Sequence, residues 1–131
     1  MGRTRQRRGF TLIEMMIVIS MILILISIAI PVYNRAILKA KESTLKQDLF
    51  TLRDVISQYT LDKQKAPQSL EDVKTAGYIH DIPKDPFTGE ANWTVDQEDS
   101  IMAVDQQEPG IVDVHSSSNE VSTDGTPYSS W

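Results

Sequence analysis

The feature that most constrains this chain is the run of residues 10–30, in which almost every side chain is apolar. Only four polar residues interrupt the run: Thr11, Glu14, Ser20 and Ser27. At ~1.5 Å per residue these 21 residues form a helix about 31 Å long, which matches the hydrocarbon thickness of a bilayer. We therefore expect a membrane-spanning helix near the N-terminus.

The charges divide at the start of this run. Four arginines precede it, namely Arg3, Arg5, Arg7 and Arg8, whereas the rest of the chain carries nine basic and eighteen acidic residues, a net charge of −9. By the positive-inside rule the arginines stay in the cytoplasm, and the chain after Pro31 lies across the membrane. From Asp81 onward there are eleven acids and one base, Lys84, which predicts an anionic, solvated surface.

Composition excludes several classes of function. A net charge of −5 and a pI near 4.9 argue against a nucleic-acid binder, which needs a basic face against the phosphates. The chain has no cysteine, so it has no disulfide, no thiolate metal site and no cysteine nucleophile. Stability must therefore come from a compact core, a bound metal or neighbouring subunits.

After Pro31 the apolar residues follow the spacing of one helix face. This face comprises Leu38, Leu45, Leu49, Leu52, Ile56 and Tyr59. Charged residues fill the other positions, and we assign them to solvent: Lys39, Lys41, Glu42, Lys46, Asp48, Arg53 and Asp54. The pattern predicts that the first helix continues to about Leu61, with a kink at Pro31.

The remaining residues predict a small α+β domain. The pattern at residues 68–73 predicts a short helix that ends at Gly77. Ser69 is its N-cap residue, and Asp72 lies three residues later, as in a capping box. A turn follows at residues 85–89 (Asp-Pro-Phe-Thr-Gly), which we expect on a surface loop. Three short runs, 92–96, 101–105 and 111–115, then predict an antiparallel sheet followed by a polar loop from Ser116 to Trp131.

Glu14 is unexpected inside an apolar segment. A charge there costs about 2.5–3.5 kcal/mol on insertion scales and marks a function with a definite partner. Two plainer readings remain open: Glu14 reaches the headgroup region, or the segment is an ordinary secretory signal cleaved after Ala29. The run is longer than the usual apolar region of a secretory signal and carries an ionisable residue, and both features argue against that signal.

The residues from Gly9 to Glu14 (Gly-Phe-Thr-Leu-Ile-Glu), after an arginine-rich leader and before an apolar helix with Pro31, resemble the signal of type IV pilins and type II secretion pseudopilins. The resemblance implies that a prepilin peptidase cuts after Gly9 and methylates the new N-terminal Phe10. It also implies that Glu14 is required for assembly.

Elementary electrostatics agrees with that role for Glu14. Cleavage after Gly9 creates a cationic amine at the end of an apolar helix, and a neighbouring subunit displaced along a helical axis can offer its amine to Glu14. Breaking such a buried pair costs ~3–5 kcal/mol, so the contact would fix the register of stacking subunits. Subunits that are related by a rotation and a rise do not close into a ring, so they form an open filament with the apolar helices at its centre.

The remainder of the chain is similar to the major, G-type pseudopilins, and the lack of cysteine favours pseudopilin over pilin. The resemblance implies a calcium ion in the C-terminal loop. Here Asp124, Asn119 and Ser117 are the candidate ligands, because calcium prefers oxygen donors. The alternative is a loop of serines that is merely solvated.

No enzyme signature is evident. Asp113, His115 and Ser116 have the residue types of a hydrolase triad, but they are neighbours on one extended segment. His80 and His115 form no recognisable zinc motif, and we expect both on the surface.

We therefore divide the chain into a leader (1–9), an apolar membrane and assembly helix (10–33) and a periplasmic globular domain (34–131). The resemblance implies a non-enzymatic subunit in the inner membrane, anchored by one helix, that polymerises into a periplasmic pseudopilus and drives export of folded proteins. Its expected partners are copies of itself, the prepilin peptidase, minor pseudopilins and the inner-membrane assembly platform. The alternatives are a type IV pilin for adhesion, motility or DNA uptake, and a small enzyme or binding domain on a membrane tether.

Overall fold

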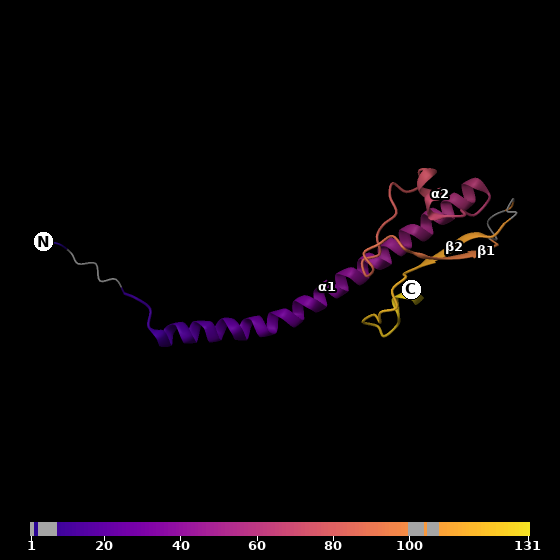
Figure 1. The fold of residues 1–131 in the computed structure, drawn as a ribbon. Helices are drawn as coiled ribbons and strands as arrows, with labels where there is room; N and C mark the ends of the chain where they lie inside the picture. Colours follow the sequence, from indigo (N-terminus) through magenta and orange to yellow (C-terminus); the bar gives the residue numbers. More distant parts are fainter. Residues whose placement is uncertain (1, 3–7, 100–103, 105–107) are drawn as a thin grey trace. The chain divides into compact units, whose positions relative to one another are not determined.

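The computed structural model of the chain describes residues 2, 8–99, 104 and 108–131. Its elements follow the order α1 (Leu12–Lys63), α2 (Leu70–Thr75), β1 (Thr94–Glu98), β2 (Gly110–His115) and a short 3-10 helix, η1 (Tyr128–Ser130) (Figure 1). The chain divides into two compact units, Met1–Leu38 and Lys39–Trp131. The predicted α+β class is confirmed.

Helix α1 has 52 residues and continues through Pro31 without a break. The side chain of Thr11 starts it, because its Oγ1 accepts a hydrogen bond from the backbone N–H of Glu14 at 3.2 Å. The helix ends at Lys63, two residues beyond the expected end, and Gln64 follows with a positive φ of 57°. The predicted long helix is therefore confirmed.

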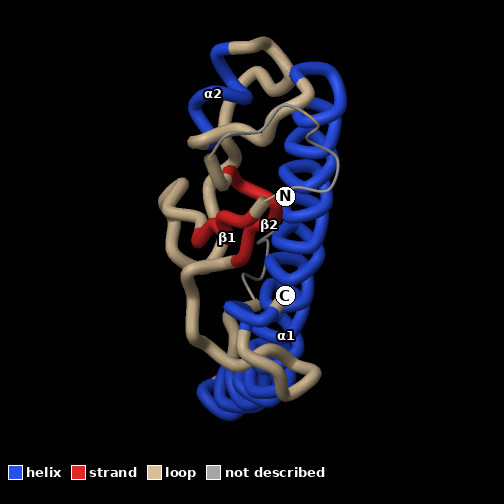
Figure 2. The backbone as a smooth tube through the Cα atoms, turned by 90° about the vertical axis from the view of Figure 1, so that its right-hand side faces the viewer, coloured by secondary structure: helices blue, strands red, loops and turns tan. Residues whose placement is uncertain are grey.

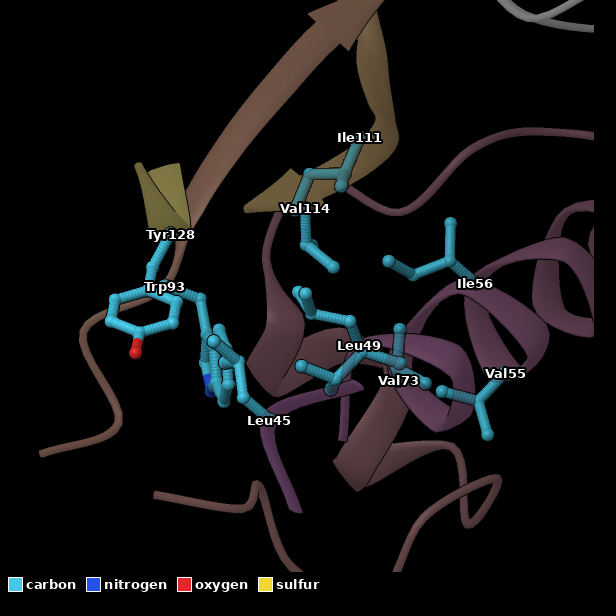
Figure 3. Packing of buried hydrophobic residues seen from close by; sticks show 10 residues of the cluster. Leu45, Leu49, Val55, Ile56, Val73, Trp93, Ile111, Val114 and Tyr128 are labelled. Atoms are coloured by element: carbon cyan, nitrogen blue, oxygen red, sulfur yellow. The ribbon is translucent and has the colours of Figure 1, made fainter. Parts of the chain in front are cut away.

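Four of the six residues assigned to the inner face of α1 are buried: Leu45, Leu49, Leu52 and Ile56. They pack in one cluster with Val73 of α2, Trp93 before β1, Ile111 and Val114 of β2, and Tyr128 of η1 (Figure 3). Since that cluster lies wholly within Lys39–Trp131, this unit has its own core. One residue assigned to solvent was predicted wrongly: Glu42 is 6% exposed.

Helix α2 forms where the capping signals predicted it. Ser69 accepts a hydrogen bond from Asp72 N–H at 3.3 Å, and the Asp72 carboxylate accepts one from Ser69 N–H at 3.0 Å. After the helix Gly77 has a φ of +86°, a conformation that favours glycine. Both the cap and the terminating glycine are confirmed.

Within the described residues the sheet has two strands, β1 and β2, which pair antiparallel (Figure 2). The expected strand at 101–105 falls outside the described residues apart from Val104, which lies in a turn. Asp96 pairs with Asp113 and Gln97 with Ile111, so Val112 is the extra residue of a bulge. Because of this bulge, Ile111 and Val114 are both buried in the core.

The turn at 85–89 forms, but its first residue is not at the surface, where we expected the whole turn. Asp85 is fully buried, and its carboxylate accepts hydrogen bonds from Phe87 N–H at 2.8 Å and from the hydroxyl of Ser116. Gly89 donates its N–H to the Asp85 carbonyl at 2.8 Å and has a φ of +75°. The turn is thus an internal anchor for the segment after β2, because a carboxylate can be buried when donors satisfy it.

Candidate functional site: the leader junction, the apolar helix and the C-terminal loop

The junction between leader and helix is exposed and has no regular structure. Gly9 and Phe10 precede α1, and Phe10 is 78% exposed. A Cβ added at Gly9 would meet no atom within 4 Å, so nothing in the described part of the chain requires glycine there. A requirement for glycine would have to come from a protein that handles this peptide bond.

Glu14 lies in the first turn of α1, where a carboxylate is favoured by the helix dipole. Its Oε2 accepts a hydrogen bond from Thr11 N–H, but the donor–acceptor distance of 3.5 Å makes this bond weak. Among the described residues, Oε1 of Glu14 has no hydrogen-bond partner. The carboxylate therefore remains available to a partner from outside the chain.

The apolar part of α1 has no cover within the described chain. None of its most apolar 18-residue stretch is buried, and by length and composition the helix can cross a membrane. Its two serines satisfy their hydroxyls internally: Ser20 donates to Met16 O and Ser27 to Ile24 O, both at 2.7 Å. This suits an apolar surrounding, where an unpaired hydroxyl is costly.

An exposed apolar surface of this size requires a bilayer or other helices around it. Burying each large side chain contributes about 1.5–3 kcal/mol, so the segment has a strong drive to leave water. Glu14 is the only carboxylate between Leu12 and Ile30. The segment thus combines a large hydrophobic driving force, which has no preferred direction, with one charged group that can fix the position of the helix against a partner.

The three candidate calcium ligands lie in the segment after β2. Ser117 is partly buried, and its hydroxyl bonds to Asn92 O and lies 3.2 Å from Thr94 Oγ1. Asn119 and Asp124 are exposed, and within the described residues their side chains make no hydrogen bond. The chemistry of two free oxygen donors fits calcium, whereas Ser117 would have to exchange its present partners.

Glu42, which the sequence analysis did not identify, attaches the C-terminal loop to α1. Glu42 of α1 accepts hydrogen bonds on Oε1 from Thr123 N–H and Tyr128 O–H, both at 2.8 Å, and on Oε2 from the Thr123 hydroxyl at 2.7 Å. Burial raises the pKa of Glu42, but the hydrogen bonds from Thr123 and Tyr128 outweigh burial, and the pKa falls below 4.5. Burial and the Glu42 carboxylate raise the pKa of Tyr128 to about 12.

The spacing of the apolar residues in α1 did indicate that Glu42 faces the core. Glu42 lies four residues after Leu38 and three before Leu45, so it belongs to the face that faces the core. Its charge had placed it with the solvated residues. An acid within an apolar face is therefore better read as a carboxylate with partners.

The catalytic triad considered from the sequence does not form. Ser116 is fully buried, and its hydroxyl donates to Asp85. His115 instead lies 3.1 Å from Asp96 and 3.6 Å from Asp113. These side chains therefore lack the linked serine and histidine that a serine hydrolase uses.

Comparison with known proteins identifies the N-terminal segment. Residues 4–30 match the family described as a prokaryotic N-terminal methylation motif. This match covers Gly9, Phe10 and Glu14. The resemblance drawn from the leader is confirmed.

Relatives extend the match to the globular part. A type II secretion system core protein G of Klebsiella michiganensis is 31% identical over 104 residues, which is 67% of this chain and 73% of the relative. The protein of that name from Escherichia coli strain K12 is 32% identical over 103 residues, 66% of this chain and 71% of the relative.

The match to a pilin is shorter. The type IV major fimbrial protein FimA of Dichelobacter nodosus is 40% identical over 62 residues, 47% of this chain and 39% of the relative. No solved structure matches the chain. With its long helix, short helix, small sheet and methylation motif, the chain belongs to the family of the type II secretion system core protein G, the major pseudopilins.

Proposed function

We propose that this chain is made as an inner-membrane precursor whose arginine-rich leader lies in the cytoplasm and whose unit Lys39–Trp131 lies in the periplasm. A prepilin peptidase removes the leader after Gly9 and methylates Phe10. The mature subunits polymerise into a periplasmic pseudopilus that helps to export folded proteins. The exposed junction at residues 8–10 supports the processing step, because a peptidase needs an accessible, extended peptide bond.

One observation carries the assembly step: the apolar part of α1, which has no cover in the described chain, contains one carboxylate, Glu14, and this carboxylate accepts only a weak hydrogen bond there. Cleavage after Gly9 turns Phe10 N into a cationic amine. A neighbouring subunit can bring this amine to Glu14, and sister helices then replace the bilayer around the apolar surface. The polymer is thereby held by apolar packing and registered by an ion pair.

Substitution of Glu14 tests this step in the full chain. Glu14→Gln keeps the size of the side chain and removes its charge, so fibres should disappear while the monomer stays in the membrane. Asp54→Asn is the matched control, since Asp54 is an exposed carboxylate on the same helix and accepts a hydrogen bond from the side chain of Gln58. Normal fibres from Glu14→Gln would overturn the proposal.

The mass of the mature chain tests the processing step. We expect a chain that begins at Phe10 and carries one extra methyl group. A mass that retains the arginines, or that begins after Ala29, would contradict the assignment of the leader.

A type IV pilin for adhesion, motility or DNA uptake is the second candidate, and the FimA match over 62 residues favours it. The two functions differ in what a deletion strain loses. Loss of protein secretion with normal surface pili supports the pseudopilin. Normal secretion with loss of surface pili supports the pilin.

For the C-terminal loop we propose that Asp124 and Asn119 supply oxygen ligands to a calcium ion, with Ser117 as the third candidate. Two exposed side chains without hydrogen bonds within the described residues support this. Calcium should raise the melting temperature of the full chain in detergent, and Asp124→Ala should abolish the rise. Identical melting curves with calcium and with chelator would remove the site.

A further inference from the structure

Three side chains that can bind a metal converge on the sheet. They are Asp96 of β1 and Asp113 and His115 of β2, and one ligand atom from each lies within 4.8 Å of the others. Asp96 and Asp113 are cross-strand partners, and His115 is two residues beyond Asp113, on the same face of β2. Asp113 and His115 share this face through the normal alternation of a strand, and the bulge at Val112 places Ile111 on the opposite, buried face with Val114.

The two carboxylates face each other directly across the strands, an arrangement that is destabilising for like charges. Arg53 of α1 compensates one of them: its Nε donates to Asp113 Oδ1 at 2.6 Å. The N–H of Val114 donates to the same oxygen at 2.8 Å. Asp113 Oδ2 is thereby turned toward His115 and Asp96, and among the described residues no lysine or arginine pairs with the Asp96 carboxylate.

The orientation of His115 makes this arrangement informative. Its Nδ1 lies 2.6 Å from the main-chain oxygen of Trp131, which can only accept, so Nδ1 carries a hydrogen. Its Nε2 lies 3.1 Å from Asp96 Oδ2 and 3.6 Å from Asp113 Oδ2. Nε2 of His115 and one oxygen from each carboxylate therefore converge on one point, where a single cation can contact all three atoms.

We propose that Asp96, Asp113 and His115 form a binding site for a divalent transition-metal cation of the zinc class. Tetrahedral zinc with bonds of about 2.0–2.1 Å holds its ligand atoms about 3.3 Å apart. The observed separations from Nε2, 3.1 and 3.6 Å, bracket that spacing. An imidazole nitrogen with two carboxylate oxygens suits zinc better than calcium, which prefers oxygen ligands alone.

The surroundings of the cluster also fit a metal site. A metal-bound histidine usually donates its other N–H to a main-chain or carboxylate oxygen, as His115 does to Trp131. Arg53 and Val114 likewise fix the orientation of Asp113. The side chains of Asp96 and Asp113 are 52% and 40% exposed, so an ion and a water in the fourth position can reach the site.

The bound ion would join β1 and β2, and through His115 it would steady the C-terminal Trp131 against the sheet. This site shares no ligand with the proposed calcium loop. It also does not depend on filament assembly, so its test can fail while the pseudopilin function stands.

Cobalt(II) is a suitable probe, because it replaces zinc in such sites and absorbs visible light. The absorption is more intense when the ion has four ligands than when it has six. The full chain in detergent is titrated with cobalt alone and then with zinc in competition. We expect one cobalt per chain, visible absorption and complete displacement by zinc. Millimolar calcium should not displace the cobalt.

Two ligand variants and a matched control locate the site. His115→Gln and Asp96→Asn should each weaken cobalt binding by about a hundredfold or more. His80→Gln makes the same change at an exposed histidine outside the cluster and should bind as the original chain does. Circular dichroism of each variant without metal shows that the fold is kept, and Asp96→Asn, at a half-exposed position, is the variant least able to disturb it.

Unchanged binding in His115→Gln or Asp96→Asn would overturn the proposal, because the metal would then sit elsewhere. Loss of binding in His80→Gln would overturn it for the same reason. No absorption at a large excess of cobalt would also overturn the proposal, because the three side chains would then bind no metal.

Discussion

The carboxylate of Glu42 should hold the C-terminal loop on α1. Substitution by alanine removes the acceptor of three hydrogen bonds, two from Thr123 and one from Tyr128. Substitution by glutamine keeps an oxygen that can serve Thr123 N–H and Tyr128 O–H together, since both now share Oε1. Comparing the two variants separates the loss of the acceptor from the loss of the charge.

The magnitudes follow from burial. Tyr128 is fully buried, so its hydroxyl finds no water in Glu42→Ala, and loss of a hydrogen bond to a charged group costs about 1.5–3 kcal/mol. Thr123 is exposed, and water replaces much of what its two donors lose. We expect about 3 kcal/mol in total for alanine and about 1 kcal/mol for glutamine, because neutral hydrogen bonds are roughly half as strong.

The pH dependence gives a second readout with a definite sign. The pKa of Glu42 lies below 4.5 in the folded chain, because the hydrogen bonds from Thr123 and Tyr128 outweigh the opposing effect of burial. Its contribution to stability is therefore complete above pH 4.5 and is lost as the pH falls through the lower folded pKa. Glu42→Gln should lose this part of the acid sensitivity.

Other carboxylates titrate in the same range. Hydrogen bonding to Lys74 lowers the pKa of Asp81, whereas burial raises that of Asp48. Both residues are present in the original chain and in Glu42→Gln, so the difference between their stability curves isolates Glu42. This difference should be constant above about pH 5 and shrink toward lower pH.

Thermal melts of the full chain in detergent, followed by near-ultraviolet circular dichroism, provide the measurement. For a unit of under 100 residues about 3 kcal/mol corresponds to a shift of about 12–24 °C, and about 1 kcal/mol to about 4–8 °C. Equal melting temperatures for Glu42→Ala and the original chain would refute the reasoning. So would an unchanged acid dependence in Glu42→Gln.

Two further substitutions test the packing around the sheet. Gly110→Ala would place a Cβ 2.6 Å from the Cβ and 2.9 Å from the carbonyl oxygen of Ala66. We expect the free energy of unfolding, measured by chemical denaturation, to fall by about 1–3 kcal/mol. Unchanged stability would contradict the close approach of the two backbones. Trp93→Phe removes the 2.8 Å hydrogen bond that the indole N–H donates to Pro83 O. We expect the free energy of unfolding to fall by about 1–3 kcal/mol, measured by urea unfolding with Trp131 as the remaining fluorophore. A change near zero would show that the indole N–H does not contribute to stability.

The sequence predicted those parts of the fold whose signals are local. The inner face of α1, the Ser69 cap and the terminating Gly77 each depend on residues within one or two helical turns, and all were found where expected. Asp85 was misplaced because its partner, Ser116, lies 31 residues away. A turn motif states how the backbone bends, but it does not state which side chains become buried.

The same limit applied to the sites. Gly9, Phe10 and Glu14 stand in one short motif and could be recognised together. The cluster of Asp96, Asp113 and His115 could not, because the antiparallel pairing of β1 with β2 places Asp96 beside Asp113 and His115. Zinc signatures in sequences rely on two close ligands in one segment, and here Asp113 and His115 are separated by a single residue on a strand.

The two glutamates of α1 that matter most differ in where their partners come from. Glu42 is buried and receives three hydrogen bonds of 2.7–2.8 Å from its own chain, so its carboxylate is already satisfied. Among the described residues the Glu14 side chain accepts one hydrogen bond, from Thr11 N–H at 3.5 Å, and it belongs to a segment that is apolar enough to cross a membrane. A carboxylate with so little internal compensation must find a cation from another molecule when its surroundings lose water. Charge removal at Glu14 should therefore abolish fibres without lowering the melting temperature of the unit Lys39–Trp131, whereas charge removal at Glu42 should lower that temperature while the Glu14 contact remains able to form.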